Sequence, residues 1–310
     1  MTFDNQPITT GNLLRPPRLK AGDTIGIVAP AGPFQTDLFA QGMAVLKNMG
    51  FKVHIPDAVF QREGFLAGKD EDRADVINTL FADPDIHGIL CARGGYGSTR
   101  VIPHLDWAVI RRHPKVFVGF SDITVLHCAF LVQAGLVTFH GPMGTTLAKA
   151  TKASLSLLQH ALMSDTPVDL KPFEGVVLNH GKAEGKIMGG NLAMLCHLVG
   201  TPYQPSFDGC ILFIEDVTEA PYRIDRMLVQ MSLAGCFDSV AGLVLGQFQD
   251  CGATSEIHDV FMRIFGPFGI PVVAGFPIGH GEDNATLPIG LRARLNTQPP
   301  QLTYLNAATT

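Results

Sequence analysis

The sequence lacks the features of membrane, disulfide-stabilised and disordered proteins. Glycine, proline or a charged residue interrupts every apolar stretch before it reaches the ~20 residues that a membrane-spanning helix needs. The six cysteines include no Cys-x-x-Cys pair and lie mostly in apolar runs, which favours buried reduced thiols over disulfides or zinc. Hydrophobic residues make up 46% and charged residues 16% of the chain, a balance typical of a well-packed globular protein.

The sequence also lacks concentrated charge and a secretory signal. Its formal net charge is −5 with no run of like charge, so neither nucleic acid nor an anionic membrane surface is expected as the main partner. Residues 1–23 contain no basic segment leading into a continuous apolar stretch. We therefore expect a cytoplasmic protein.

What is present is a regular alternation of short apolar runs with helical patterns, beginning at residue 24. Examples are "TIGIVAPAG", "TDLFAQGMAVLKNMG", "GILCARGG" and "DITVLHCAFLVQAG". Strands alternating with helices of this length indicate βαβ units and a mostly parallel sheet. We therefore predict an α/β protein whose N-terminal domain has a flavodoxin-like or glutaminase-like parallel sheet. Ligands of such sheets bind beyond the C-terminal ends of the strands.

The length of 310 residues suggests two domains. Residues 1–150 form the first predicted domain. Residues 151–182 begin with a helix-like segment and continue with turn formers, so we interpret them as a linker. Residues 183–310 mix strands and helices less regularly and form a smaller second α/β domain.

Ser121 lies where a strand-like run ends and a helical pattern begins, in "KVFVGFSDITVLHCAF". A serine there is an ordinary N-cap, and on this motif alone the cap is the simpler interpretation. A serine on a sharp strand-to-helix turn can also be an exposed nucleophile. Ile123 occupies the last glycine position of G-x-S-x-G, so the motif does not support an α/β-hydrolase fold.

Glycines follow another apolar strand in "CARGGYGSTR" (91–100). They do not fit the G-x-G-x-x-G dinucleotide fingerprint, and no G-K-[ST] follows, so a P-loop is excluded. The segment is either a plain glycine-rich turn or an oxyanion hole that shares a site with Ser121.

Two further polar residues occupy positions suited to chemistry. Glu215 follows a buried-looking strand in "ILFIEDVTEAPYRIDRML", where acidic residues more often are solvated or cap a helix. His280 lies between glycines in the loop "GFPIGHGEDNATLPIG", a setting suited to acid–base catalysis. His127 falls within an apolar helix and is expected to be structural. No pattern of residues predicts a metal or a cofactor.

Together these segments resemble a known family. In order, "GDTIGIVAPAGP", "RGGYGSTR", "VGFSDIT", "FHGPM", "GKIMGGNLAML", "LFIEDVTEAPYRIDRML" and "GFPIGHGEDNATLPIG" are similar to successive blocks of the LD-carboxypeptidases. These are serine peptidases, and the family also contains the microcin immunity hydrolases. The resemblance spans about residues 20–295 and implies that Ser121 is the nucleophile, Glu215 the carboxylate and His280 the base.

The resemblance also implies the surroundings of the three residues. Backbone N–H groups of Asp122 and of the "GGYG" turn would form the oxyanion hole. The resemblance points to the turn as a whole, and our choice of Gly95 over Gly94 within it does not come from the resemblance. The Asp122 side chain is expected to cap the helix in place of Ser121. The site should lie in the cleft between the domains.

Family members of the carboxypeptidase branch release terminal D-alanine from murein tetrapeptides during peptidoglycan recycling, and they are usually homodimers. Arg93 and Arg223 are candidates for binding the terminal carboxylate. One alternative is a microcin-type hydrolase of aminoacyl-nucleotide amides with the same triad. That branch resembles a longer chain with an extra aromatic-bearing loop for stacking the base, whereas here the single tryptophan, Trp107, precedes the nucleophile and residues 147–182 lack such a loop. A second is a non-catalytic binder that closes two lobes on a small ligand.

Overall fold

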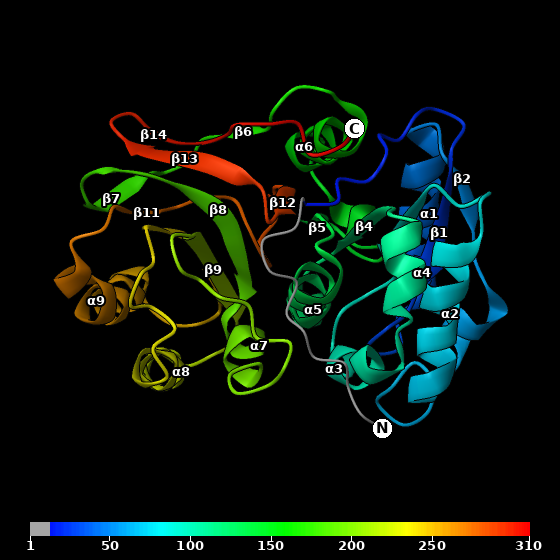
Figure 1. Cartoon of the computed structure of the whole chain (residues 1–310), viewed down its shortest axis with the longest axis horizontal. Coiled ribbons are helices and arrows are strands. Elements are labelled where there is room, and N and C mark those ends of the chain that lie inside the picture. The colour runs from blue at the N-terminus through cyan, green and yellow to red at the C-terminus, as the bar shows by residue number, and fades with distance from the viewer. Residues whose placement is uncertain (1–12) are drawn as a thin grey trace.

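The computed structural model describes residues 13–310 of the chain. The expectation about a secretory signal concerns residues 1–23, the first twelve of which lie outside the described residues. The described chain forms two α/β lobes, each built on one sheet (Figure 1). No helix within residues 13–310 is both long and apolar enough to cross a membrane.

The first lobe is built on a six-stranded sheet with the order β2-β1-β3-β4-β5-β12. Its strands are β1 (Thr24–Val28), β2 (Lys52–His54), β3 (Gly88–Cys91), β4 (Val116–Gly119), β5 (Thr138–His140) and β12 (Leu287–Ile289). Strands β1 to β5 are parallel, and β12 is antiparallel to β5. The order 2-1-3-4-5 is that of flavodoxin-like folds, which confirms the predicted fold class.

Helices cover both faces of this sheet. They are α1 (Thr36–Asn48), α2 (Asp70–Ala82), α3 (Ser98–Val101), α4 (Trp107–Arg112), α5 (Thr124–Ala134) and α6 (Lys152–Met163). Leu158 and Leu162 of α6 face the side of the sheet to which Val116 and Val118 point. Phe117, which alternates with them along β4, contacts Phe81 of α2 and Phe130 of α5. The apolar run of β4 is thus buried on both sides, as expected for a central parallel strand.

The second lobe is built on an eight-stranded sheet with the order β6-β14-β13-β8-β9-β10-β11-β7. Its strands are β6 (Asp169–Leu170), β7 (Val176–Asn179), β8 (Lys182–Asn191), β9 (Ile211–Val217), β10 (Gly242–Gln249), β11 (Val272–Ala274), β13 (Arg292–Thr297) and β14 (Pro300–Tyr304). The central strands β8 to β11 are parallel and the flanking ones antiparallel. Helices α7 (Leu192–His197), α8 (Pro221–Leu233) and α9 (Thr254–Phe265) lie together below the sheet in Figure 1.

The two lobes exchange elements along the chain. The segment interpreted as a linker contains α6, which packs on the first sheet, and the strands β6 and β7, which belong to the second. Strand β12 returns from the second lobe to pair with β5 of the first. The domain boundaries at residues 150 and 183 stay a prediction, and the connections between the lobes are more extensive than a simple linker.

Candidate active site

Ser121 lies on the turn between β4 and α5. Its φ of 65° is in the left-handed region, where a residue other than glycine costs of order 1–3 kcal/mol and is often found at a functional site. Gly119 permits the turn, because a Cβ there would lie 2.7 Å from the Ile123 side chain. His127 of α5 fixes the base of the turn, with Nε2 2.8 Å from the Gly119 carbonyl oxygen and Nδ1 2.9 Å from Thr138 Oγ1. Burial lowers the pKa of His127 to about 4, so this imidazole is neutral, in the structural role predicted for it.

Ser121, His280 and Glu215 form one chain of hydrogen bonds. Ser121 Oγ lies 3.0 Å from His280 Nε2, and His280 Nδ1 lies 2.7 Å from Glu215 Oε2. The Ser121 side chain makes no N-cap hydrogen bond to the helix that follows. The simpler interpretation of Ser121 as a helix cap is therefore wrong.

Burial and charge together set the protonation of His280. Burial lowers its pKa, but the hydrogen bond to Glu215 and the negative charge of that carboxylate outweigh burial, and the pKa of His280 is raised above its usual value. Glu215 itself is fully buried within β9 and is neither solvated nor capping a helix. Its carboxylate therefore acts on the imidazole without screening by water.

Glycines allow the carboxylate to approach the histidine loop. Gly279 has a φ of 119°, and a Cβ on it would lie 2.5 Å from Glu215 Oε2. Beside Glu215, the Asp216 carboxylate accepts hydrogen bonds from Asn191 Nδ2 at 2.8 Å and from the Ala193 N–H at 3.0 Å. Burial and the adjacent Glu215 raise the pKa of Asp216 to about 6. Asp216 thereby ties β9 to the start of α7 rather than joining the chain of hydrogen bonds at Ser121.

The glycine-rich turn after β3 lies against the Ser121 turn. A Cβ on Gly94 would be 3.1 Å from Ser121 Cβ, so only glycine fits without displacing the serine. The Asp122 side chain accepts a hydrogen bond from the Ser98 N–H at 2.8 Å, and thus joins the two turns. The expectation that Asp122 caps α5 is wrong, because its carboxylate is turned toward the start of α3. The N–H groups of Gly95 and Asp122 donate to no group within residues 13–310.

Arg73 of α2 supports this glycine-rich turn from beneath. Its buried guanidinium donates to the Gly97 carbonyl oxygen at 3.0 Å and to the Gly68 carbonyl oxygen at 3.1 Å, and it pairs with Asp70. Nothing in the helical pattern of residues 70–82 distinguished this arginine from a surface charge, and we did not predict it.

The two arginines predicted as carboxylate ligands make no hydrogen bond to Ser121, His280 or Glu215. Arg93 is exposed and donates to the Pro33 carbonyl oxygen at 2.7 Å. Arg223 of α8, also exposed, lies 3.7 Å from Glu219, which precedes that helix. Neither lines the cavity that adjoins His280.

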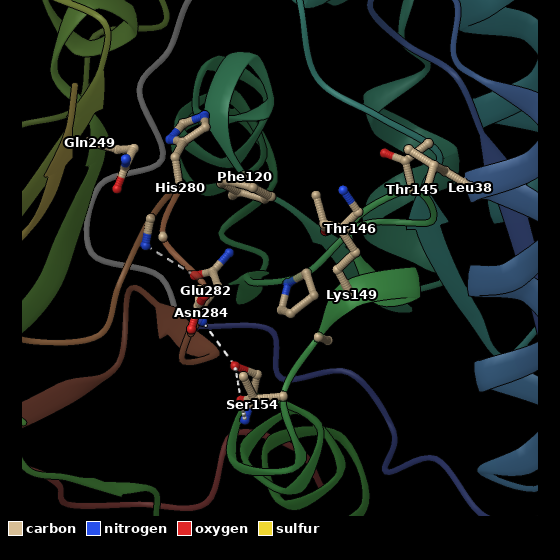
Figure 2. A pocket seen from close by; sticks show the side chains of 15 residues that line it. Leu38, Phe120, Thr145, Thr146, Lys149, Ser154, Gln249, His280, Glu282 and Asn284 are labelled. Carbon is tan, nitrogen blue, oxygen red and sulfur yellow. Dashed lines mark hydrogen bonds between the residues drawn. The ribbon is translucent and has the colours of Figure 1, made fainter.

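That cavity has a volume of about 750 Å³ and lies between the lobes. It is lined by Leu38, Phe120, Pro142, Thr145, Thr146, Lys149, Ala150, Thr151, Ser154, Gln249, Gly279, His280, Gly281, Glu282 and Asn284. Figure 2 shows Thr146 and Lys149 on one side of it and His280, Gln249 and Glu282 on the other. Lys149 was not predicted, although it follows β5, and the rule that ligands bind beyond the strand ends points to this segment.

The loop that carries His280 is held from both lobes. The Gly281 N–H donates to Gln247 Oε1 of β10 at 2.9 Å. On the other side, the Asn284 N–H donates to Ser154 Oγ of α6 at 2.9 Å, and the Thr151 hydroxyl donates to Asp283 (Figure 2 shows Asn284 beside Ser154). Both supports fix the imidazole relative to Ser121.

The Ser121 hydroxyl is hydrogen-bonded to an imidazole, and a buried carboxylate orients that imidazole. Such an arrangement is suited to acyl transfer. Unpaired backbone N–H groups beside the hydroxyl are the further element that such chemistry needs. Within residues 13–310, no group of three or more His, Cys, Asp or Glu side chains is arranged to hold a metal ion.

The chain is similar in sequence to known proteins along most of its length. Family models described as the LD-carboxypeptidase N-terminal and C-terminal domains match residues 25–141 and 184–295. The chain is 37% identical to a probable murein peptide carboxypeptidase of Bacillus subtilis, over 91% of this chain and 92% of the relative. It is 30% identical to the microcin C7 self-immunity protein MccF of Escherichia coli, over 90% and 92%.

A solved structure is similar along nearly the whole chain. The crystal structure of a muramoyltetrapeptide carboxypeptidase from Oxalobacter formigenes is 33% identical in sequence, with a TM-score of 0.81. The alignment covers 91% of this chain and 97% of that one.

Proposed function

Because the chain belongs to the LD-carboxypeptidase family, we propose that it releases the terminal D-alanine from murein tetrapeptides, with Ser121 as nucleophile, His280 as general base and Glu215 as the orienting carboxylate. One observation carries this proposal. The three residues are distant in sequence but meet in a continuous chain of hydrogen bonds. Glu215 is 65 positions from His280 and lies 2.7 Å from it, and Ser121 is 159 positions from His280 and lies 3.0 Å from it.

The chemistry follows from these groups. A neutral His280 takes the proton of Ser121 as Oγ bonds to the carbonyl carbon of the scissile peptide. Glu215 stabilises the imidazolium that forms and keeps Nδ1 protonated, so Nε2 is the basic atom. His280 then gives its proton to the departing amine as the C–N bond breaks. Water hydrolyses the acyl-enzyme by the same proton transfers.

The negative oxygen of the tetrahedral intermediate needs hydrogen-bond donors. The free N–H of Asp122 directly follows the nucleophile. The Gly94 carbonyl oxygen accepts from the Gly32 N–H at 3.2 Å, and in a trans peptide the Gly95 N–H points the opposite way. Gly95, rather than Gly94, is therefore our candidate for the second donor.

The first alternative is cleavage of an aminoacyl-nucleotide amide by the same three residues. Recognition of a base usually relies on an aromatic side chain over which it stacks. Trp107 packs against Phe130 in the first lobe, with ring centroids 5.9 Å apart, and does not line the cavity. Phe120, the one Phe, Tyr or Trp of the described chain that lines it, is buried against the His280 ring. These contacts favour the peptide substrate.

The second alternative is a non-catalytic binder made of two lobes. A binder has no need of a strained serine in contact with a histidine and a buried carboxylate. The left-handed backbone of Ser121, the raised pKa of His280 and the close packing around Glu215 therefore favour an enzyme. A cytoplasmic role in peptidoglycan recycling and a homodimer remain parts of the prediction.

The test compares release of alanine from murein tetrapeptide ending in D-alanine with release from its all-L analogue, by mass spectrometry. We expect D-alanine only, and a loss of roughly 10⁴-fold or more in kcat for Ser121→Ala. Circular dichroism checks that the variant is folded. No release by the folded wild-type protein, or undiminished release by Ser121→Ala, would overturn the proposal.

A further inference from the structure

The proposed mechanism determines on which side of Ser121 the departing residue lies. His280 must give its proton to the departing amine, so that amine is next to the imidazole when the C–N bond breaks. His280 lines the 750 Å³ cavity between the lobes. Under the proposed mechanism the cavity is the space beside the imidazole that can receive the released residue, and that residue carries the free terminal carboxylate of the substrate.

Besides the titratable His280, two side chains that line the cavity carry a full charge, Lys149 and Glu282. Figure 2 places them on opposite sides. The Lys149 ammonium makes no hydrogen bond or ion pair with any group in the described part of the chain, residues 13–310. We propose that Lys149 binds the terminal carboxylate of the substrate. This inference rests on the proposed function and names the residue that recognises the free chain end.

The backbone that carries Lys149 is well fixed. The Thr145 N–H donates to the Ala92 carbonyl oxygen at 2.9 Å, which ties this segment to the end of β3. The Lys149 N–H donates to the Thr146 carbonyl oxygen at 3.1 Å, and Leu147 between them is buried. An anchored backbone with a free ammonium suits a point charge that must meet a carboxylate in one place.

The other cationic groups are less well placed for this task. Arg223 has Glu219 as its partner and Arg93 donates to Pro33, and neither lines the cavity. The positive end of α6 also adjoins the cavity, but it already interacts with Asp283 through Thr151 and Ser154. Lys149 is thus the cation that remains for the substrate.

The experiment compares two peptides, murein tetrapeptide with a free D-alanine carboxylate and the same peptide ending in a carboxamide. Values of kcat/KM for both are measured in the wild type, in Lys149→Met, and in Lys152→Met as a matched control. Lys152 is exposed on the first turn of α6 and does not line the cavity. Arg93→Met tests the rival ligand.

We expect the wild type to prefer the acid, and Lys149→Met to lower that preference by roughly 10- to 100-fold through a loss on the acid alone, as for a lost hydrogen bond to a charged group. Lys152→Met keeps the wild-type ratio. An unchanged ratio in Lys149→Met, or its loss in Arg93→Met instead, overturns the inference and leaves the peptidase activity established.

Binding separates this inference from the proposed function. Ser121→Ala, and Ser121→Ala combined with Lys149→Met, are titrated with both peptides by calorimetry. The inference is supported if the acid binds more tightly than the amide to Ser121→Ala but not to the double variant. This holds even if no bond is cleaved. Equal binding of the two peptides, or binding of neither, overturns it.

Discussion

At the scale of single residues, Glu215 controls the acid–base behaviour of His280. Its hydrogen bond and charge raise the pKa of His280 against the effect of burial. In the proposed mechanism His280 is the general base and works only when neutral, so kcat/KM should rise with pH through this pKa, above the ordinary value of about 6.5. At lower pH the imidazole is protonated before substrate binds, and activity is lost.

Replacement of Glu215 by glutamine tests this dependence. Glu215→Gln removes the charge that raises the pKa, so the rise of kcat/KM should move to lower pH, while kcat falls by roughly 10³- to 10⁴-fold because the imidazole tautomer is no longer fixed. The measurement is the pH profile of D-alanine release in both proteins. A profile with an unmoved acidic limb in the glutamine variant would show that another group titrates there.

Sequence reasoning joined these three residues in one site only through resemblance to a family, although the local setting of His280 already suited acid–base catalysis. Glu215 and His280 are 65 positions apart, and Ser121 and His280 are 159 apart, so no local spacing connects them. On local grounds Ser121 was a helix cap and Glu215 a solvated or capping acid. Lys149 carries no local signal beyond its position after a parallel strand, and Arg73 carries none.

At the scale of elements, the strands with a clear apolar pattern were predictable. The runs "TIGIV", "GILC" and "VFVG" became β1, β3 and β4, because an apolar run bounded by glycine or polar residues is characteristic of a central parallel strand. β6 and β7, two and four residues long, are too short to show a period and fell within the predicted linker. Pairing of β12 with β5 joins Leu287 to His140, a distant contact that no local pattern encodes.

The contact between α6 and the His280 loop leads to a second prediction. Thr151 and Ser154 both donate to Asp283, and this fixes the loop from the side of the first lobe. Asp283→Ala should lower kcat by roughly 10- to 100-fold with little change in KM, because a small displacement of the imidazole from Ser121 slows the proton transfer more than substrate binding.

Asp283→Asn is the matched control for this prediction. Its Oδ1 can still accept from both hydroxyls, so the variant should retain most of the wild-type kcat. Steady-state kinetics of D-alanine release at one pH suffices. A wild-type kcat in Asp283→Ala would show that Gln247 and the glycines hold the loop without help from α6.

At the scale of the whole molecule, the chain passes between the lobes more than once, and hydrogen bonds also join them. β12 belongs to the first sheet although the chain reaches it from the second lobe, and the buried Tyr304 hydroxyl of β14 donates to the Pro288 carbonyl oxygen at 2.8 Å. Helix α6 packs on the first sheet while its first turn holds the His280 loop. The cleft between the lobes thus depends on contacts that either lobe would lose if it unfolded alone.

This architecture predicts that the lobes unfold together, although chains with two separate cores often unfold in steps. The single tryptophan, Trp107, packs against Phe130 in the first lobe, so its fluorescence reports on that lobe, while far-UV circular dichroism reports on helices and strands of both. In urea the two signals should give coincident transitions. A fluorescence midpoint apart from the dichroism midpoint would mean that β12 and α6 do not couple the lobes. The cleft could then lose its geometry while one sheet stays folded. Activity would be lost at the urea concentration that unfolds the less stable lobe.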